Sequence, residues 1–256
     1  MNETILAACF ARPIAHRGLH AAGAGRIENS IAAAQAAIAA GYAIECDVQQ
    51  TCDGGLVVFH DDRLDRLTET EGPVRERDSA RLRQLLLRGS SETIPTFEGF
   101  LAAVGGTTPL IVEIKSAFDG ETHAARRVAE SVAAYPGPLA IKSFDPLMMA
   151  FLRENARMLG IERFPLGIVA EAAYETHEWA FLSGAERQAM THFLHYPQTR
   201  PDFISWNAEN LPHAIPFLLR AARGLPVMAW TVRSEQKREA ITSWSDQIVF
   251  EGFAPA

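Results

Sequence analysis

Short apolar segments alternate along the chain with longer segments in which apolar residues have helical spacing. Several short segments are almost continuously apolar, such as Leu110-Ile111-Val112, which is typical of strands in a parallel sheet that is covered by helices. We predict strands at 13–16, 42–48, 56–60, 110–114, 139–143, 166–169, 203–206, 227–232 and 247–250. The repetition of strand and helix therefore predicts an α/β fold with a parallel sheet.

Capping residues support the predicted helices between these strands. Asn29 precedes an Ala-rich segment at 30–40 and Gly41 follows it, which predicts a helix with Asn29 as its N-cap. Asp145-Pro146 opens a second helical segment at 147–159, where the aspartate is a cap and the proline occupies the first turn. Both segments fit helices that connect parallel strands.

The number of strand–helix units predicts a closed barrel. About eight units in roughly 250 residues suit a (β/α)8 TIM barrel better than an open sheet. The segments 61–95 and 174–202 are irregular, and in the first we expect short helical pieces within a long connection. We expect one domain over residues 1–256, with its barrel core at roughly 13–253.

Composition and charge restrict the partners of this barrel. The net charge of −7 disfavours nucleic acids and anionic membranes, which need a positive surface. The uncharged run at 29–44 is shorter than the ~20 apolar residues that span a bilayer, and residues 1–10 lack the basic start of a signal peptide. We expect no stable membrane insertion.

The three cysteines fit neither a disulfide framework nor a zinc site, which indicates a reducing, cytoplasmic location.

Carboxylates within apolar strands are the first candidate chemistry. Glu45 and Asp47 are two residues apart on a predicted strand, so they project to the same side. Facing the barrel interior, they would require a cation, and oxygen ligands suit Mg²⁺ or Ca²⁺ rather than zinc. Glu113, within another apolar strand, is the natural third carboxylate. The alternative is a pair that faces outward and binds basic residues of a helix.

Two histidines follow predicted strands on either side of this pair. His16 begins the sequence His16-Arg17-Gly18, and His60 follows the strand at 56–60. With carboxylates between them, the two histidines look like an acid–base couple around a metal ion, although each alone would suit a surface loop. Lys115 either neutralises a bound anion or pairs with Glu113. Glu28 is a further candidate near the metal.

Aromatic residues follow three later strands. Phe144, Trp206 and Trp230 either pack the barrel rim or form the wall of a pocket for an organic group. We expect the remaining histidines, which have no partners at ligand spacing, to be surface or packing residues: His123, His177, His192, His195 and His213. The serines lack the surroundings of a nucleophile elbow, so a Ser–His–Asp hydrolase is disfavoured.

Several short motifs occur together in a characteristic order. They are His16-Arg17-Gly18, Glu28-Asn29-Ser30, Glu45-x-Asp47, Asp53-Gly54, Val57-x-x-His60-Asp61, Leu64-x-Arg66-x-Thr68, Ile94-Pro95-Thr96 and Glu113-x-Lys115. Their combination and spacing resemble the glycerophosphodiester phosphodiesterase family. The resemblance is dense at 13–115 and continues more thinly through Ser143-Phe144 and Ala229-Trp230-Thr231. The chain departs from the family at Ile27, where proline is frequent, and at 249–253, where the family often has Thr-Asp followed by Pro.

The resemblance implies a (β/α)8 barrel that hydrolyses glycerophosphodiesters to glycerol 3-phosphate and an alcohol with one divalent cation, Mg²⁺ or Ca²⁺. The segment at 61–95 is the short form of the connection, without the large insertion domain of some members. The implied roles are metal binding for Glu45, Asp47 and Glu113, acid–base catalysis for His16 and His60, phosphate binding for Arg17, a position near the metal for Glu28 and positive charge for Lys115. We expect these last three residues, together with Phe144 and Trp230, to contact the substrate.

Three other functions compete with this one. A related barrel phosphodiesterase would act on a lysophospholipid, an intact phospholipid or another phosphodiester, but the net charge of −7 disfavours docking to an anionic membrane. A non-catalytic barrel would bind a glycerophosphodiester or a sugar phosphate and should have lost a histidine or a carboxylate. A sugar-acting barrel would use Glu45 and Glu113 and would leave both histidines without a role. The alcohol and the oligomeric state are not predicted.

Overall fold

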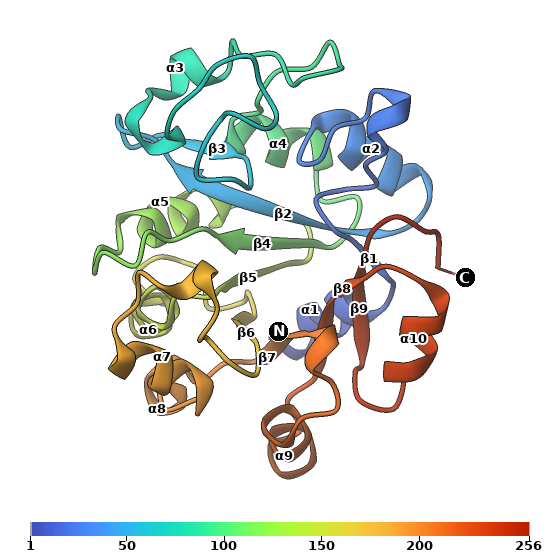
Figure 1. Cartoon of the computed structure of the whole chain (residues 1–256), viewed down its shortest axis with the longest axis vertical. Helices are drawn as coiled ribbons and strands as arrows, with labels where there is room; N and C mark the ends of the chain where they lie inside the picture. Colours follow the sequence, from blue (N-terminus) through green and yellow to red (C-terminus); the bar gives the residue numbers. More distant parts are fainter. Residues whose placement is uncertain (1, 256) are drawn as a thin grey trace.

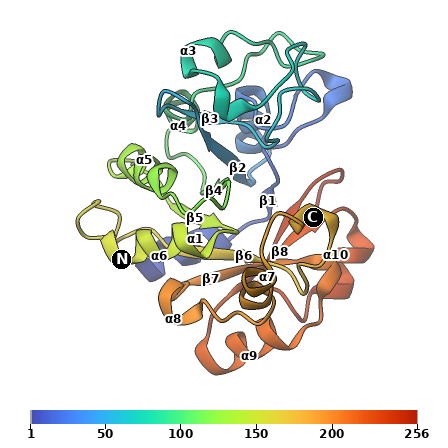
Figure 2. The same ribbon diagram turned by 60° about the vertical axis from the view of Figure 1, so that its left-hand side comes forward.

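The computed structural model describes residues 2–255, which form a barrel of parallel strands surrounded by helices (Figures 1 and 2). Strand β1 pairs in parallel with both β2 and β9, and this pairing closes the sheet. The eight barrel strands are β1 (Ile14–Ala15), β2 (Ala43–Gln50), β4 (Leu110–Ile114), β5 (Leu139–Ser143), β6 (Leu166–Ala170), β7 (Phe203–Asn207), β8 (Val227–Val232) and β9 (Gln247–Phe250). The predicted (β/α)8 barrel without a large insertion domain is therefore confirmed.

Helices cover the outside of the barrel (Figure 1). The α-helices after β1 are α2 (Ile31–Ala39), α3 (Ser79–Leu82), α4 (Phe97–Val104), α5 (His123–Val132), α6 (Pro146–Asn155), α7 (Gly184–Thr191), α8 (Tyr196–Thr199), α9 (Ala214–Arg223) and α10 (Glu235–Ile241). Short 3-10 helices are η1 (Ala22–Ala24), η2 (Val74–Glu76), η3 (His177–Trp179) and η4 (Ala208–Asn210). No helix within 2–255 has the length and apolar character needed to cross a bilayer.

The two predicted caps have different outcomes. Asp145 caps α6 as predicted, because its side chain accepts a hydrogen bond from Leu147 N at 2.8 Å. The prediction for α2 is wrong by one residue, since the side chain of Ser30 accepts from Ala33 N at 3.1 Å. Asn29 is thereby free for another role, which is described with the site below.

Strand β3 (Leu56–Val58) is the one predicted strand that lies outside the barrel. It runs antiparallel to β2, with Val58 opposite Val48, whereas repeated strand–helix units had suggested parallel pairing. The chain reverses at 51–55, and Phe59 N donates to Asp47 O at 3.0 Å. Because β2 extends beyond its barrel neighbours and β3 returns along it, the residues after β3 come back to the barrel mouth.

The N-terminal end of the barrel interior is filled by an apolar layer and covered by α1 (Asn2–Phe10). Cys9 of α1 is fully buried against this layer, and the ring of Phe10 lies 5.9 Å from that of Phe203 in an edge-to-face arrangement. The layer consists of Ile14, Ala43, Ile111, Ala140, Phe203, Met228 and Val249. Helix α1 was not predicted from the sequence, and its burial explains why residues 1–10 carry an apolar centre.

Gly167 of β6 leaves the space that the Phe203 ring occupies. A Cβ atom at Gly167 would lie 2.2 Å from the ring, and Phe203 is fully buried. We expect Gly167→Ala to lower the free energy of unfolding by about 1–3 kcal/mol through overpacking. Urea unfolding measures the change, with Gly184→Ala as control because no atom lies within 4 Å of a Cβ there. Equal stability of the two variants would contradict the proposed steric role.

Candidate active site

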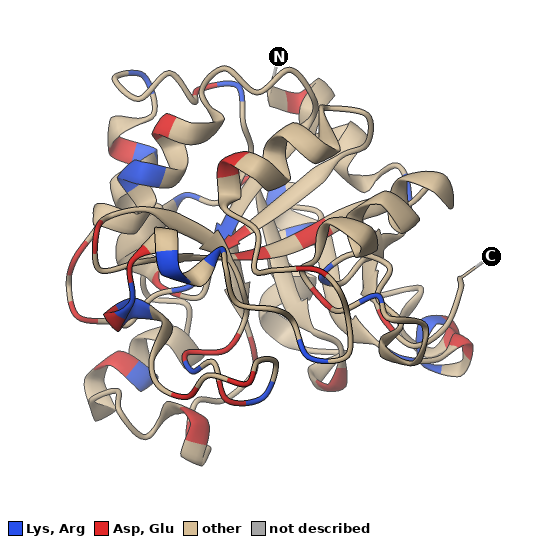
Figure 3. Ribbon diagram, turned by 90° about the horizontal axis from the view of Figure 1, so that it is seen from above, with Lys and Arg blue, Asp and Glu red and all other residues tan. Residues whose placement is uncertain are grey.

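Polar side chains lie directly above the apolar layer because alternate strand residues share a face. Each of them lies two residues beyond a layer residue: His16 after Ile14, Glu45 after Ala43, Glu113 after Ile111, Lys142 after Ala140 and Glu251 after Val249. Asp47 and Lys115 come two residues further along β2 and beyond β4. Figure 3 shows acidic and basic positions meeting at these strands. The site therefore lies at the C-terminal mouth, where barrel enzymes place their chemistry.

Glu45, Asp47 and Glu113 converge as a buried acidic triad. Oxygen atoms of the three side chains lie within 4.8 Å of one another, and each residue is at most 6% exposed. Asp47 and Glu113 are register partners on β2 and β4. Glu45 Oε1 is buried and accepts no well-aligned hydrogen bond within residues 2–255, although the Lys142 ammonium lies 3.1 Å from it. A set of three buried carboxylates offers only oxygen ligands, which suits a hard divalent cation.

Two lysines lie against the triad. Lys142 Nζ lies 3.1 Å from Glu45 Oε1 and 3.0 Å from Glu113 Oε2, and its side chain is 2% exposed. Lys115 Nζ lies 3.3 Å from Glu113 Oε1 and 3.8 Å from Asp47 Oδ1. Burial lowers the pKa of Lys142, but the charges of Glu45 and Glu113 outweigh burial and raise it overall. Burial alone would raise the pKa of Glu113, whereas the two lysines bring it below its usual value.

Asn29 holds Asp47 through both atoms of its amide. Asn29 Nδ2 donates to Asp47 Oδ2 at 3.0 Å, and Asp47 N donates to Asn29 Oδ1 at 3.2 Å. Asn29 and Arg17 both have left-handed backbones, with φ of 60° and 56°. Such conformations of non-glycine residues cost about 1–3 kcal/mol and are typical of functional sites. The capping interpretation of Asn29 is therefore replaced by a role at the acidic triad.

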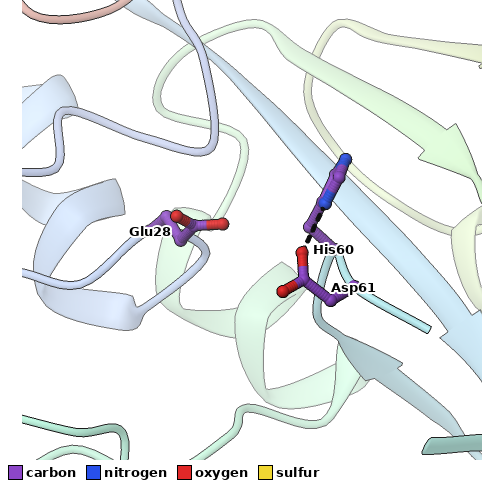
Figure 4. Close-up of side chains that lie close together, drawn as sticks. All are labelled: Glu28, His60 and Asp61. Carbon is purple, nitrogen blue, oxygen red and sulfur yellow. Dashed lines mark hydrogen bonds and ion pairs between the residues drawn. The ribbon is translucent and has the colours of Figure 1, made fainter. Parts of the chain in front are cut away.

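Glu28 lies at the centre of an arginine network and outside the triad. Its Oε1 accepts from Arg17 at 2.6 Å and from Arg66 at 2.7 Å, and Arg66 also binds Asp61 at 2.6 Å. Burial would raise the pKa of Glu28, but the two arginines lower it overall. Figure 4 shows Glu28 facing His60 and Asp61 from a separate segment. This network joins the loop after β1 to the connection after β3.

Each candidate catalytic histidine binds a carboxylate through Nδ1. His16 Nδ1 lies 2.6 Å from Glu251 Oε2, and His60 Nδ1 lies 2.8 Å from Asp61 Oδ1 (Figure 4). Glu251 in turn accepts from Arg233 at 2.7 Å, as Asp61 does from Arg66. The hydrogen bond from His16 lowers the pKa of Glu251. These contacts leave Nε2 of each imidazole as the nitrogen available to a substrate.

A cavity of about 390 Å³ opens over these groups. Its lining includes the charged or titratable residues His16, His60, Arg17 and Lys115 and the aromatic residues Phe144 and Trp230. The rings of Phe144 and Trp230 are 5.4 Å apart and almost perpendicular. Trp206, in contrast, is fully buried and stacks on His213 at 5.0 Å. The structure thus brings two of the three candidate aromatic residues to the cavity and assigns the third to packing.

Lys142, Glu251 and Asn29 are the site residues that the sequence analysis missed. Lys142 and Glu251 follow the same two-residue alternation that linked Glu45 with Asp47, and this signal would have indicated them. Glu251 also lies where the chain departs from the family's usual strand ending. Asn29 belongs to the Glu28-Asn29-Ser30 motif, but its position before a helix suits capping equally well.

The fold and the site are those of a barrel enzyme that carries an acidic triad between two histidines at its C-terminal mouth. The model of the glycerophosphoryl diester phosphodiesterase family matches residues 16–250. The chain belongs to this family, and the protein is a phosphodiesterase as the sequence motifs predicted.

Individual relatives match the whole chain or a part of it. YhdW of Bacillus subtilis is 28% identical over 260 residues, which cover 93% of this chain and 97% of the relative. The glycerophosphodiester phosphodiesterase of Caldanaerobacter subterraneus is 38% identical over 97 residues, covering 35% of this chain and 40% of the relative. A phosphodiesterase of Oleispira antarctica, solved with the product sn-glycerol-3-phosphate, superimposes with a TM-score of 0.74 at 22% identity and covers 95% and 94% of the two chains.

The carboxylates that hold the histidines should make stability depend on acid pH. The folded pKa values of Asp61 and Glu251 are lowered, so their stabilising contribution is present above their ordinary pKa near ~4 and is lost as pH falls through the folded pKa. We expect Asp61→Asn and Glu251→Gln to be less stable than wild type at pH 6, and we expect this difference to shrink as pH falls from about 4 towards about 2. Urea unfolding over this range measures the difference. A constant difference at all pH values would contradict the assignment.

Proposed function

We propose that the protein hydrolyses glycerophosphodiesters and releases glycerol 3-phosphate and an alcohol. The observation that carries the proposal is the acidic triad between two carboxylate-bound histidines at the barrel mouth. Family membership supports this substrate class, and the Oleispira antarctica relative was solved with sn-glycerol-3-phosphate. Every histidine and carboxylate that the proposed catalysis needs is present, which favours an enzyme over a non-catalytic binding barrel.

Glu45, Asp47 and Glu113 would hold one divalent cation, Mg²⁺ or Ca²⁺. The bound cation supplies positive charge against the phosphodiester and its transition state. Asn29 keeps the Asp47 carboxylate in place through its two hydrogen bonds. The arrangement therefore presents ligand oxygens that need little rearrangement when the cation binds.

His16 and His60 would move the protons of the reaction. One imidazole takes a proton through Nε2 from the attacking water, or from a glycerol hydroxyl that forms a cyclic phosphate which water then opens, and the other donates a proton to the leaving alkoxide. Glu251 and Asp61 orient these rings through Nδ1, in the manner of a carboxylate that fixes a histidine tautomer. Positions on separate elements, after β1 and after β3, suit attack and departure on different sides of phosphorus.

Arg17 and Lys115 would bind the phosphate oxygens. Both line the cavity and are only partly exposed, with side-chain exposures of 15% and 22%. Their charges stabilise the developing negative charge more strongly there than in bulk water. Glu28 holds Arg17 in this position. Phe144 and Trp230 would form the wall that contacts the organic part of the substrate.

The location that we propose is the cytoplasm. Cys9, Cys46 and Cys52 are unpaired, and the first two are buried. Free thiols of this kind persist in a reducing compartment. We propose a small-molecule substrate that reaches the enzyme from solution, because the cavity is lined by charged and aromatic groups that suit a single phosphodiester headgroup.

A panel of substrates tests the proposed function. We expect purified protein with Mg²⁺ or Ca²⁺ to release glycerol 3-phosphate from glycerophosphocholine, glycerophosphoethanolamine or glycerophosphoglycerol. His16→Ala and His60→Ala should each lower kcat by about 10²–10⁴-fold, as is typical of a lost general acid or base, while the circular dichroism spectrum shows that the variants remain folded. His123→Ala is the control, because its side chain is 70% exposed and is not among the residues that line the cavity. Cleavage of lysophospholipid alone, or wild-type kcat without either histidine, would contradict the proposal.

Removal of divalent cations tests the proposed metal site separately. Chelation with EDTA should abolish turnover, and an excess of Mg²⁺ or Ca²⁺ should restore it, because three carboxylates prefer hard cations. Glu113→Gln should weaken Ca²⁺ binding in calorimetry. Restoration by Zn²⁺ alone would count against the all-oxygen site.

A further inference from the structure

Lys142 is a buried lysine whose ammonium group contacts two members of the acidic triad. Its Nζ lies 3.1 Å from Glu45 Oε1 and 3.0 Å from Glu113 Oε2, while these carboxylates come from β2 and β4 and the lysine from β5. Lys142 and Glu113 are register partners. The ammonium group therefore lies beside the oxygens that would hold a divalent cation.

The position of Lys142 differs from that of Lys115 in its access to water. The Lys142 side chain is 2% exposed, whereas that of Lys115 is 22% exposed and faces the cavity. Lys115 has room to turn towards a bound phosphate. Lys142 also lines the cavity but is almost completely enclosed, and removal of its carboxylate partners would leave a buried charge uncompensated. Lys142 is thus a fixed charge of the site.

We propose that Lys142 is an internal cation that weakens divalent metal binding and holds the acidic triad together when no metal is bound. This inference rests on the proposed metal site. An ammonium group on Glu45 and Glu113 offsets one of the triad's three negative charges and repels a divalent ion that binds the same carboxylates. Such repulsion is strong in a buried site, where screening by water is weak.

The proposal makes two coupled expectations. Without Lys142 the three carboxylates repel one another in the metal-free protein, so its stability falls. With a divalent cation present, the same carboxylates bind it without competition, so affinity rises. A purely structural lysine would lower stability without making metal binding tighter. The two effects of one substitution therefore separate the proposed role from packing.

Calorimetric titration with CaCl₂ and MgCl₂ tests the proposal on metal-free protein. We expect Lys142→Met and Lys142→Gln to bind either ion about tenfold or more tightly than wild type. Lys142→Gln retains amide donors for the carboxylates and serves if Lys142→Met does not fold. Lys237→Gln is the matched control, since Lys237 pairs with Glu209 at 2.9 Å and is not part of the triad's contacts. The metal affinity of this variant should equal that of wild type.

Thermal unfolding gives a second readout that needs no substrate. The melting temperature of both Lys142 variants should be below that of wild type without metal and should rise more than that of wild type on adding Ca²⁺. Unchanged or weaker metal affinity in both variants would overturn the proposal. If wild type releases glycerol 3-phosphate only with metal while the variants keep wild-type affinity, this inference fails and the proposed function stands. If the variants bind metal more tightly but wild type shows no turnover, this inference stands and the proposed function fails.

Discussion

The barrel mouth is organised by the need to compensate three carboxylates that are removed from water. Glu45, Asp47 and Glu113 are almost fully buried, and an isolated buried carboxylate is too costly to remain ionised. Lys142 compensates the triad from within and Lys115 does so from the cavity side. The other charged side chains of the site lie around these carboxylates and lysines. A divalent cation would complete the compensation that the lysines begin.

Backbone geometry brings these charges together from distant parts of the sequence. Alternation along each strand turns every second side chain inward, which places Glu45 and Asp47 above Ala43, and Lys142 above Ala140. His60 reaches the mouth by a different route, because β3 returns antiparallel to β2. The site therefore depends on one hairpin that projects from the barrel as well as on the barrel itself.

Sequence patterns predicted the strands and the acidic triad because both follow local rules. Buried strands are continuous apolar runs, and a carboxylate within such a run stands out, as Glu113 does. The direction of β3 could not be read in the same way, since an apolar run carries no information on which neighbour it pairs with. The partners of Lys142 and Glu251 are non-local contacts, and they become visible only when the register of neighbouring strands is known. For Asn29, two functions fit one sequence position, and the fold decides between them.

The two histidines depend on different parts of the molecule for their orientation. His60 binds its neighbour Asp61, so its carboxylate comes from the same loop, whereas Glu251 lies 235 residues from His16. Glu251 directly follows β9, and His16 directly follows β1. The hydrogen bond between them thus crosses the seam at which the first and last strands close the barrel. Orientation of His16 requires that seam to be formed, while orientation of His60 requires only the connection after β3. Because a catalytic pair needs both rings in place, the proposed chemistry requires the closed barrel. Glu251, where the chain departs from the family's usual strand ending, makes the contact with His16 that depends on this closure.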